Sequence, residues 1–167
     1  MSQSALPAPS HLERDADGRL IGLRFDSTAP SAAAAEQVWL IAVDGSTHAL
    51  NAVTEAIRLA QAMKSCSLHL INVQAWLSLE AAEHELASRA WAATAEARKL
   101  LEQAGLGWHL HVAMGEAAER ILAQAERLHC TGIVTGSRGL GATQGMLLGS
   151  VAYKLMHMSH LPVLLVR

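Results

Sequence analysis

The chain is poor in charged side chains and has no excess of either sign. Lys, Arg, Asp and Glu together make up 17% of its 167 residues, and the formal net charge at pH 7 is −2. The basic residues are scattered, with no run longer than Arg98-Lys99. Surfaces that bind nucleic acid or anionic membranes need a concentrated basic patch. We therefore expect neither nucleic acid nor a membrane as a partner.

Long apolar runs and paired cysteines are also missing. No apolar run approaches the roughly 20 residues that a helix needs to cross a bilayer. The first residues lack the basic segment and apolar core of a secretory signal. The two cysteines, Cys66 and Cys130, belong to no C-x-x-C motif, and we interpret them as small buried thiols in a reducing compartment. A cytoplasmic protein is the expectation.

Apolar residues, by contrast, are abundant at 51% and follow an alternating pattern from residue 36 onward. Continuous apolar runs predict strands, and intervening segments with helical spacing predict helices. Strands apolar on both faces that alternate with helices indicate a parallel sheet covered on both sides. The predicted fold class is α/β, a three-layer sandwich with a five-stranded parallel sheet. The expected strands are 38–43, 68–73, 108–113, 132–135 and 163–166; the expected helices are 46–63, 79–104, 116–129 and a segment after 150.

Residues 1–35 differ from the rest and are interpreted as an N-terminal extension to a domain at 36–167. Within them, Asp17-Gly18 separates two alternating runs, which is typical of a β-hairpin. We expect this hairpin to pack on the domain or on a partner subunit. The Asp-x-Asp-Gly sequence also has the form of a calcium loop, but Arg24 stands where that loop requires glutamate.

The most informative stretch runs from residue 131 to residue 150. A short apolar strand is followed by Gly136, Gly139 and Gly149, with Ser150 directly after the last glycine. The spacing is G-x2-G-x9-G-S, and a helical pattern follows it. Glycines allow the backbone to approach an anion closely, and the free N–H groups of a helix start point toward it. This stretch therefore predicts a phosphate-binding loop.

This spacing, together with Val43-Asp44-Gly45-Ser46 and the final segment 161–167, resembles universal stress proteins of the ATP-binding type. The resemblance covers roughly residues 36–167. It implies an adenine nucleotide alpha hydrolase-like fold with strand order 3-2-1-4-5, ATP as ligand with Mg²⁺ accompanying it, and a role in the stress response. It also implies a homodimer formed through the fifth strand. In that order Asp44 and Gly136 end neighbouring strands at the switch point, where ligands bind in such sheets.

The resemblance assigns twelve residues to the nucleotide site. Ala42 and Val43 would contact the base through their backbone, and Asp44 would lie near the ribose and the metal. The loop and helix residues would surround the phosphates. Thr135 departs from the family, which often has methionine there. The full set is Ala42, Val43, Asp44, Val73, Thr135, Gly136, Arg138, Gly139, Gly149, Ser150, Val151 and Ala152.

Several of these residues have a plainer alternative interpretation. Asp44 is also suited to cap the following helix, and Ser150 to act only as an N-cap. Val73 is equally consistent with plain core packing, and Arg138 with a solvated loop charge. Trp76 either flanks the base or anchors a loop.

No catalytic residues are predicted, because neither a nucleophile–base pair nor an acid–base pair stands near the loop. The lysine of the standard P-loop is missing. A nucleotide-binding regulatory module is therefore favoured over a slow Mg²⁺-dependent ATPase and over a dimeric interaction module without nucleotide. Nine histidines include His109 and His111 on one strand face, but no carboxylate or cysteine completes a metal site at ligand spacing. Packed or surface histidines are the expectation.

Overall fold

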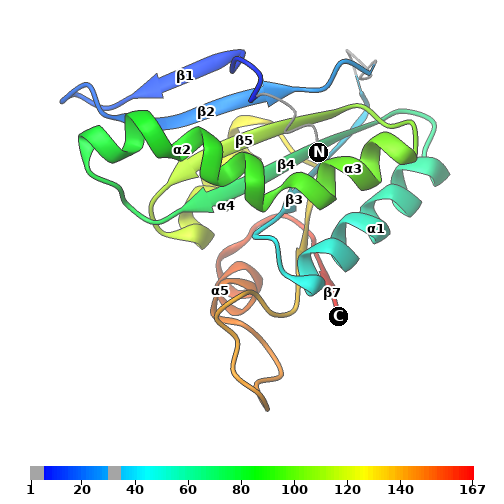
Figure 1. Ribbon diagram of the computed structural model, residues 1–167. Coiled ribbons are helices and arrows are strands. Elements are labelled where there is room, and N and C mark those ends of the chain that lie inside the picture. The colour runs from blue at the N-terminus through cyan, green and yellow to red at the C-terminus, as the bar shows by residue number, and fades with distance from the viewer. Residues whose placement is uncertain (1–5, 30–34) are drawn as a thin grey trace.

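The computed structural model describes residues 6–29 and 35–167 of the chain. Strands and helices alternate through most of it (Figure 1). None of the helices in the described ranges combines the length and the apolar character needed to cross a membrane. In chain order the elements are β1 His11–Arg14, β2 Leu20–Asp26, β3 Gln37–Ala42, α1 Thr47–Ala62, β4 Cys66–Gln74, α2 Leu79–Ala93, α3 Ala95–Gln103, β5 Trp108–Met114, α4 Ala117–Arg127, β6 Gly132–Gly136, α5 Ser150–Met158 and β7 Val163–Val166.

A single seven-stranded sheet has the order β1-β2-β5-β4-β3-β6-β7. The strands from β5 to β7 are parallel and follow the order that the family resemblance implied. The chain leaves β3 in one direction and returns on its other side at β6. The carboxyl ends of β3 and β6 are therefore the switch point, where a crevice opens between the connecting loops.

The prediction of five strands was wrong, because the N-terminal hairpin extends the sheet by two. β1 and β2 pair antiparallel around a turn in which Gly18 has φ +80°, and β2 then pairs antiparallel with β5, with Leu23 opposite Val112. Without the hairpin, β5 would be an edge strand with unpaired backbone groups. The alternating pattern indicated the hairpin, but it carries no information about which strand the hairpin joins.

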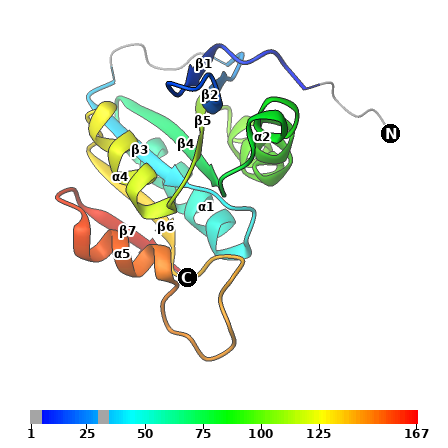
Figure 2. The ribbon, with the colours of Figure 1, turned by 90° about the vertical axis from the view of Figure 1, so that its left-hand side faces the viewer.

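Helices cover both faces of the sheet, as Figure 2 shows with α4 and α5 on one side and α1 and α2 on the other. The larger apolar cluster lies under α1, α2 and α3 and includes Ile41 and Leu70, both fully buried. The smaller cluster lies under α4 and α5 around Leu40 and Ile133. Burial of both faces explains why the parallel strands are mostly apolar, with a few buried polar residues such as His69, Asn72 and His111 among them.

The single helix predicted at 79–104 is in fact two helices that meet at Thr94. Thr94 is fully buried, and its hydroxyl donates to the carbonyl of Ala90 at 2.8 Å. The Arg98 guanidinium stacks on the Trp91 ring, 3.3 Å from its centroid, and donates to the Trp91 carbonyl at 2.8 Å. Side chains that donate hydrogen bonds to backbone carbonyls in this way compete with the helical hydrogen bonds and bend the helix.

Candidate functional site

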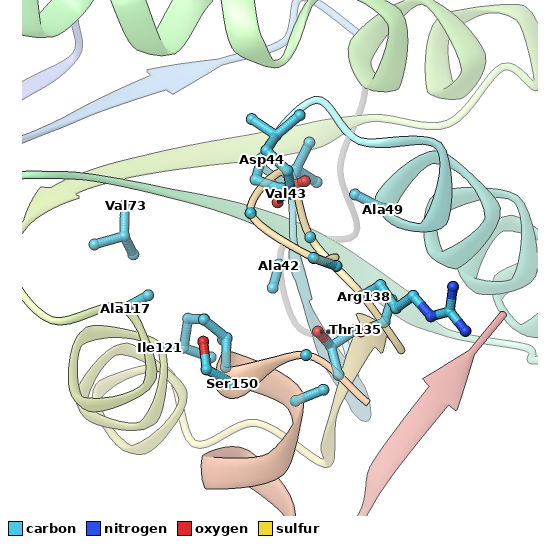
Figure 3. Close-up of a pocket in the computed structure, with 18 of the residues that line it drawn as sticks. Ala42, Val43, Asp44, Ala49, Val73, Ala117, Ile121, Thr135, Arg138 and Ser150 are labelled. Carbon is cyan, nitrogen blue, oxygen red and sulfur yellow. Dashed lines mark hydrogen bonds between the residues drawn. The ribbon is translucent and has the colours of Figure 1, made fainter. Parts of the chain in front are cut away.

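A cavity of about 270 Å³ opens at the carboxyl ends of β3 and β6. Figure 3 shows it between the loop after β3, the start of α4, the loop after β6 and the start of α5. All twelve residues assigned to the site from the sequence line it. Eight further residues contribute to the lining: Ala49, Ile71, Ala117, Ile121, Leu140, Gly141, Ala142 and Met146.

Asp44 joins the two loops that form the cavity. Its Oδ1 accepts from the backbone N–H of Ser46 at 2.9 Å, which makes a tight turn after β3. Its Oδ2 accepts from the backbone N–H of Leu140 at 3.1 Å, across 96 residues of sequence. The alternative in which Asp44 caps the next helix is wrong, because Ser46 is the N-cap of α1 and accepts from Ala49 N–H at 3.2 Å. The carboxylate instead fixes the glycine-rich loop over the end of β3.

The three motif glycines stand where an added Cβ would be in close contact with neighbouring atoms. A Cβ on Gly139 would lie 2.6 Å from Asp44 Oδ2, and one on Gly136 would lie 2.7 Å from the backbone carbon of His48. At Gly149 the nearest atom would be the Arg138 Cα at 3.2 Å. The Gly149 N–H also donates to the Ser137 carbonyl at 2.7 Å, which closes the loop on itself. These contacts explain why the motif has glycine at positions 136, 139 and 149.

The start of α5 is the part of the cavity best suited to an anion. Its N-cap is Gly149, which supplies no side-chain hydrogen bond, whereas α1, α2 and α4 are each capped by a side chain. Ser150 is therefore the first helical residue, and the alternative in which it is only an N-cap is wrong. Uncapped N–H groups at a helix start carry partial positive charge and attract anions. Ser150, Val151 and Ala152 present these groups on the cavity wall.

The opposite part of the cavity is apolar. Val73 is the penultimate residue of β4, while Ala117 and Ile121 come from the first turns of α4, and Figure 3 shows them gathered on one side. The helical spacing of Ala117 and Ile121 within the predicted helix 116–129 is typical of core packing and does not assign either residue to the site. Their spacing of four residues places them on one helix face, but only the position of α4 shows that this face also lines the cavity.

Two polar side chains at the loop have orientations that the sequence could not give. In Figure 3 the Arg138 side chain extends away from the apolar side of the cavity and toward β7, so its backbone lines the cavity while its guanidinium points outward. Thr135 is buried, and its hydroxyl donates to the Gly136 carbonyl at 3.3 Å. In this conformation neither side chain offers a free donor to the centre of the cavity.

Trp76, which the sequence leaves as either a residue that flanks the base or a loop anchor, does not line the cavity, and neither does Gly115. The Trp76 ring is 54% exposed, with the guanidinium groups of Arg19 and Arg120 at 6.0 and 5.7 Å from its centroid. Gly115 has φ +132°, and a Cβ there would lie 2.8 Å from Arg120 Nε. The loop-anchor interpretation of Trp76 therefore holds, and Gly115 makes room for an arginine and not for a ligand.

The histidines form a hydrogen-bonded chain on the α4 side of the sheet. His69 Nδ1 lies 2.9 Å from His111 Nε2, Ser67 Oγ lies 3.2 Å from His69 Nε2, and Gln124 Nε2 lies 3.1 Å from His111 Nδ1. With Gln124 as donor, each ring accepts at Nδ1 and donates at Nε2. No group of three or more His, Cys, Asp or Glu in the described ranges is arranged to hold a metal ion.

Burial lowers the pKa of His69 to about 4 and that of His111 to about 3, with further lowering from neighbouring His109 and Arg24. Asp26 adjoins this chain through His109. Burial acts to raise the pKa of Asp26, but hydrogen bonds from Ser10, His109 and Arg24 outweigh it and lower that pKa to about 2.

This arrangement predicts acid sensitivity. Because the unfolded chain protonates these two histidines near pH 6.5 and the folded protein does not, their contribution to stability is complete above pH 6.5. It is lost as the pH falls toward 4, at up to about 1.4 kcal/mol per pH unit for each histidine. Urea unfolding between pH 7.5 and 5 measures this slope, and His111→Gln should reduce it. A free energy of unfolding that does not change across this range would contradict the prediction.

The model of the universal stress protein family matches residues 37–167. Universal stress protein YxiE of Bacillus subtilis is 31% identical over 144 residues, which cover 77% of this chain and 97% of that protein. Universal stress protein MJ0531 of Methanocaldococcus jannaschii is 28% identical over 136 residues, covering 77% and 80%.

Solved structures share the fold at lower identity. Hypothetical protein MJ0577 superposes with a TM-score of 0.68 at 24% identity, covering 80% of this chain and 96% of that one. A universal stress protein in complex with cAMP gives 0.62 at 24%, covering 80% and 98%. The Archaeoglobus fulgidus protein in complex with dAMP gives 0.63 at 18%, covering 78% and 97%. An Arabidopsis thaliana protein with AMP bound gives 0.59 at 16%, covering 78% and 90%.

Proposed function

Because the chain belongs to the universal stress protein family, we propose that its cavity binds an adenine nucleotide, ATP in the cell, and that the protein acts as a regulatory nucleotide-binding module. The observation that carries the proposal is the uncapped start of α5, which faces the glycine-rich loop across the cavity. Neighbours of the same fold that were crystallised with cAMP, dAMP or AMP support adenine as the base.

The two halves of the cavity match the two halves of such a ligand. The phosphates would lie against Gly139, Gly149 and the N–H groups of Ser150, Val151 and Ala152, where glycines let the backbone approach. The base would lie against Val73, Ala117 and Ile121, where apolar side chains exclude water from its faces. A largely apolar pocket with a few convergent polar groups is the usual form of a small-molecule site.

Mg²⁺ would accompany the triphosphate, held mainly by phosphate oxygens. This ion keeps several waters and commonly needs only one or two protein carboxylates. Asp44 is the carboxylate in the cavity lining and fits that role. Bound Mg²⁺ would supply charge neutralisation of the phosphates. Asp44 and Arg138 are the titratable side chains of the lining, which favours binding and a conformational role over rapid hydrolysis.

Equilibrium dialysis with labelled ATP and Mg²⁺ tests this function. We expect saturable binding with one nucleotide per chain, competed by unlabelled AMP. Asp44→Asn should weaken it by about tenfold, because the loss of charge weakens the hold on Leu140 N–H and removes the carboxylate beside the phosphates. No retention of label at millimolar ATP would remove the proposal.

We also propose that the protein is a homodimer that pairs through β7. We further propose that it is cytoplasmic, which is consistent with its two cysteines being free thiols. β7 is an edge of the sheet, and all four of its residues are partly exposed, including Leu165. An apolar edge of this kind is stabilised by pairing with another strand. Light scattering should give twice the chain mass, and Leu165→Lys should shift it toward the monomer. A monomeric mass for the unmodified protein would contradict this proposal.

A further inference from the structure

The N-terminal hairpin creates a second groove, separate from the nucleotide cavity. It has a volume of about 380 Å³ and lies between the hairpin, β5 and α4. In Figure 2 the hairpin lies above α4 at the upper edge of the sheet. The family match begins at residue 37, so β1 and β2 are additions to the shared domain. The groove is therefore a feature of this chain and not of the common fold.

One wall of the groove is a polar stripe on α4. Arg120, Gln124 and Arg127 are spaced by four and three residues, which places them on one helix face, and all three line the groove. Arg24 of β2 lines the opposite side. Three guanidinium groups thus border one hollow in a chain whose formal net charge is −2.

These arginines are only partly neutralised. The acid in the lining is Glu13, whose Oε2 accepts from Arg127 NH1 at 3.2 Å. Arg24 pairs through Nε with Asp26 at 2.7 Å, beyond the groove lining. Arg120 has no carboxylate within 4 Å in residues 6–29 and 35–167; it rests against the Trp76 ring instead. A guanidinium presents its donors in a planar fork that suits phosphate and carboxylate.

The floor of the groove contains a polar side chain that is uncharged at pH 7. His111 is 8% exposed and lies in the lining, held between His69 and Gln124 by hydrogen bonds. Its low pKa, caused first by burial, keeps the ring neutral at pH 7. The basic side chains that line the groove are Arg24, Arg120 and Arg127, together with His11, and Glu13 is the carboxylate that pairs with Arg127.

We propose that this groove is a second binding site, for a small molecule that carries phosphate or carboxylate groups and displaces Glu13 from Arg127. The shape supports a small ligand, because the hollow is closed by the hairpin on one side and by α4 on the other. The groove shares no lining residue with the nucleotide cavity, although α4 contributes residues to both.

Isothermal titration with inorganic pyrophosphate and, separately, with citrate tests the proposal at constant ionic strength. Every titration is repeated in Gly139→Val, in which nucleotide binding is expected to be weakened by displacement of the Asp44 carboxylate. We expect binding of one probe to persist in that variant. Arg120→Gln should weaken it by about tenfold or more, and Glu13→Gln should strengthen it several-fold by removing the competing carboxylate. The stronger probe identifies the ligand as a phosphate or a carboxylate compound.

Glu13→Gln makes this test independent of folding, since a variant that merely disturbed the hairpin would bind more weakly and not more tightly. Absence of heat with both probes at millimolar concentration would overturn the proposal. So would binding that disappears in Gly139→Val and survives in Arg120→Gln, because the probes would then occupy the nucleotide cavity.

Discussion

Replacing Gly139 with valine is expected to reduce the affinity for adenine nucleotide by about 100-fold or more. A Cβ at this position would lie 2.6 Å from Asp44 Oδ2, so the carboxylate must move and release the Leu140 N–H that it accepts at 3.1 Å. The loop would then lose its position over the end of β3. Each hydrogen bond from the loop to a charged phosphate contributes about 1.5–3 kcal/mol, and two lost bonds account for the predicted change.

Gly141 provides the matched control within the same loop. A Cβ on Gly141 has no atom within 4 Å, and its backbone does not need a positive φ. Gly141→Val should therefore leave the affinity within a few-fold of the unmodified protein. Titration calorimetry with ATP on both variants decides the matter. Equal affinities for Gly139→Val and Gly141→Val would show that the contact with Asp44 does not position the binding loop.

Gly136→Ala is expected to destabilise the whole domain by about 3 kcal/mol. The added methyl group would lie 2.7 Å from the backbone carbon and 2.9 Å from the carbonyl oxygen of His48, in the first turn of α1. Neither β6 nor α1 can move easily, because β6 is fully buried and α1 packs against it. Overpacking a rigid core usually costs 1–3 kcal/mol and sometimes more.

Thermal unfolding measures this effect. For a chain of this length, 3 kcal/mol corresponds to a fall in Tm of about 6–12 °C. Gly141→Ala again serves as the control and should change Tm by little, since its Cβ has open space. A Gly136→Ala protein with an unchanged Tm would mean that β6 and α1 are less closely packed than the structure indicates.

The sequence predicted many of the residues that line the cavity but not the full extent of the sheet. The spacing of Gly136, Gly139 and Gly149 identified the loop because each glycine lies in close contact with backbone atoms or with the Asp44 carboxylate, and such contacts favour a residue without a side chain. The order of the parallel strands followed from the family resemblance, and the sheet has that order. The match of the family model to residues 37–167 confirms the resemblance itself.

Features that depend on distant contacts could not be predicted in the same way. The docking of β2 on β5, the break at Thr94 and the joining of His69 to His111 each depend on residues far apart in the chain or on the packing of one side chain. The stripe that contains Ile121 looked like core packing, and only the placement of α4 shows that its first turns line the cavity.

A crystal structure of the protein grown with AMP tests the central claim most directly. We expect the phosphate to lie beside the N–H groups of Ser150 and Val151, and the base to lie against Val73 and Ile121, with Asp44 still joining the two loops. A nucleotide bound elsewhere on the molecule, or a cavity that stays empty at saturating AMP, would contradict it.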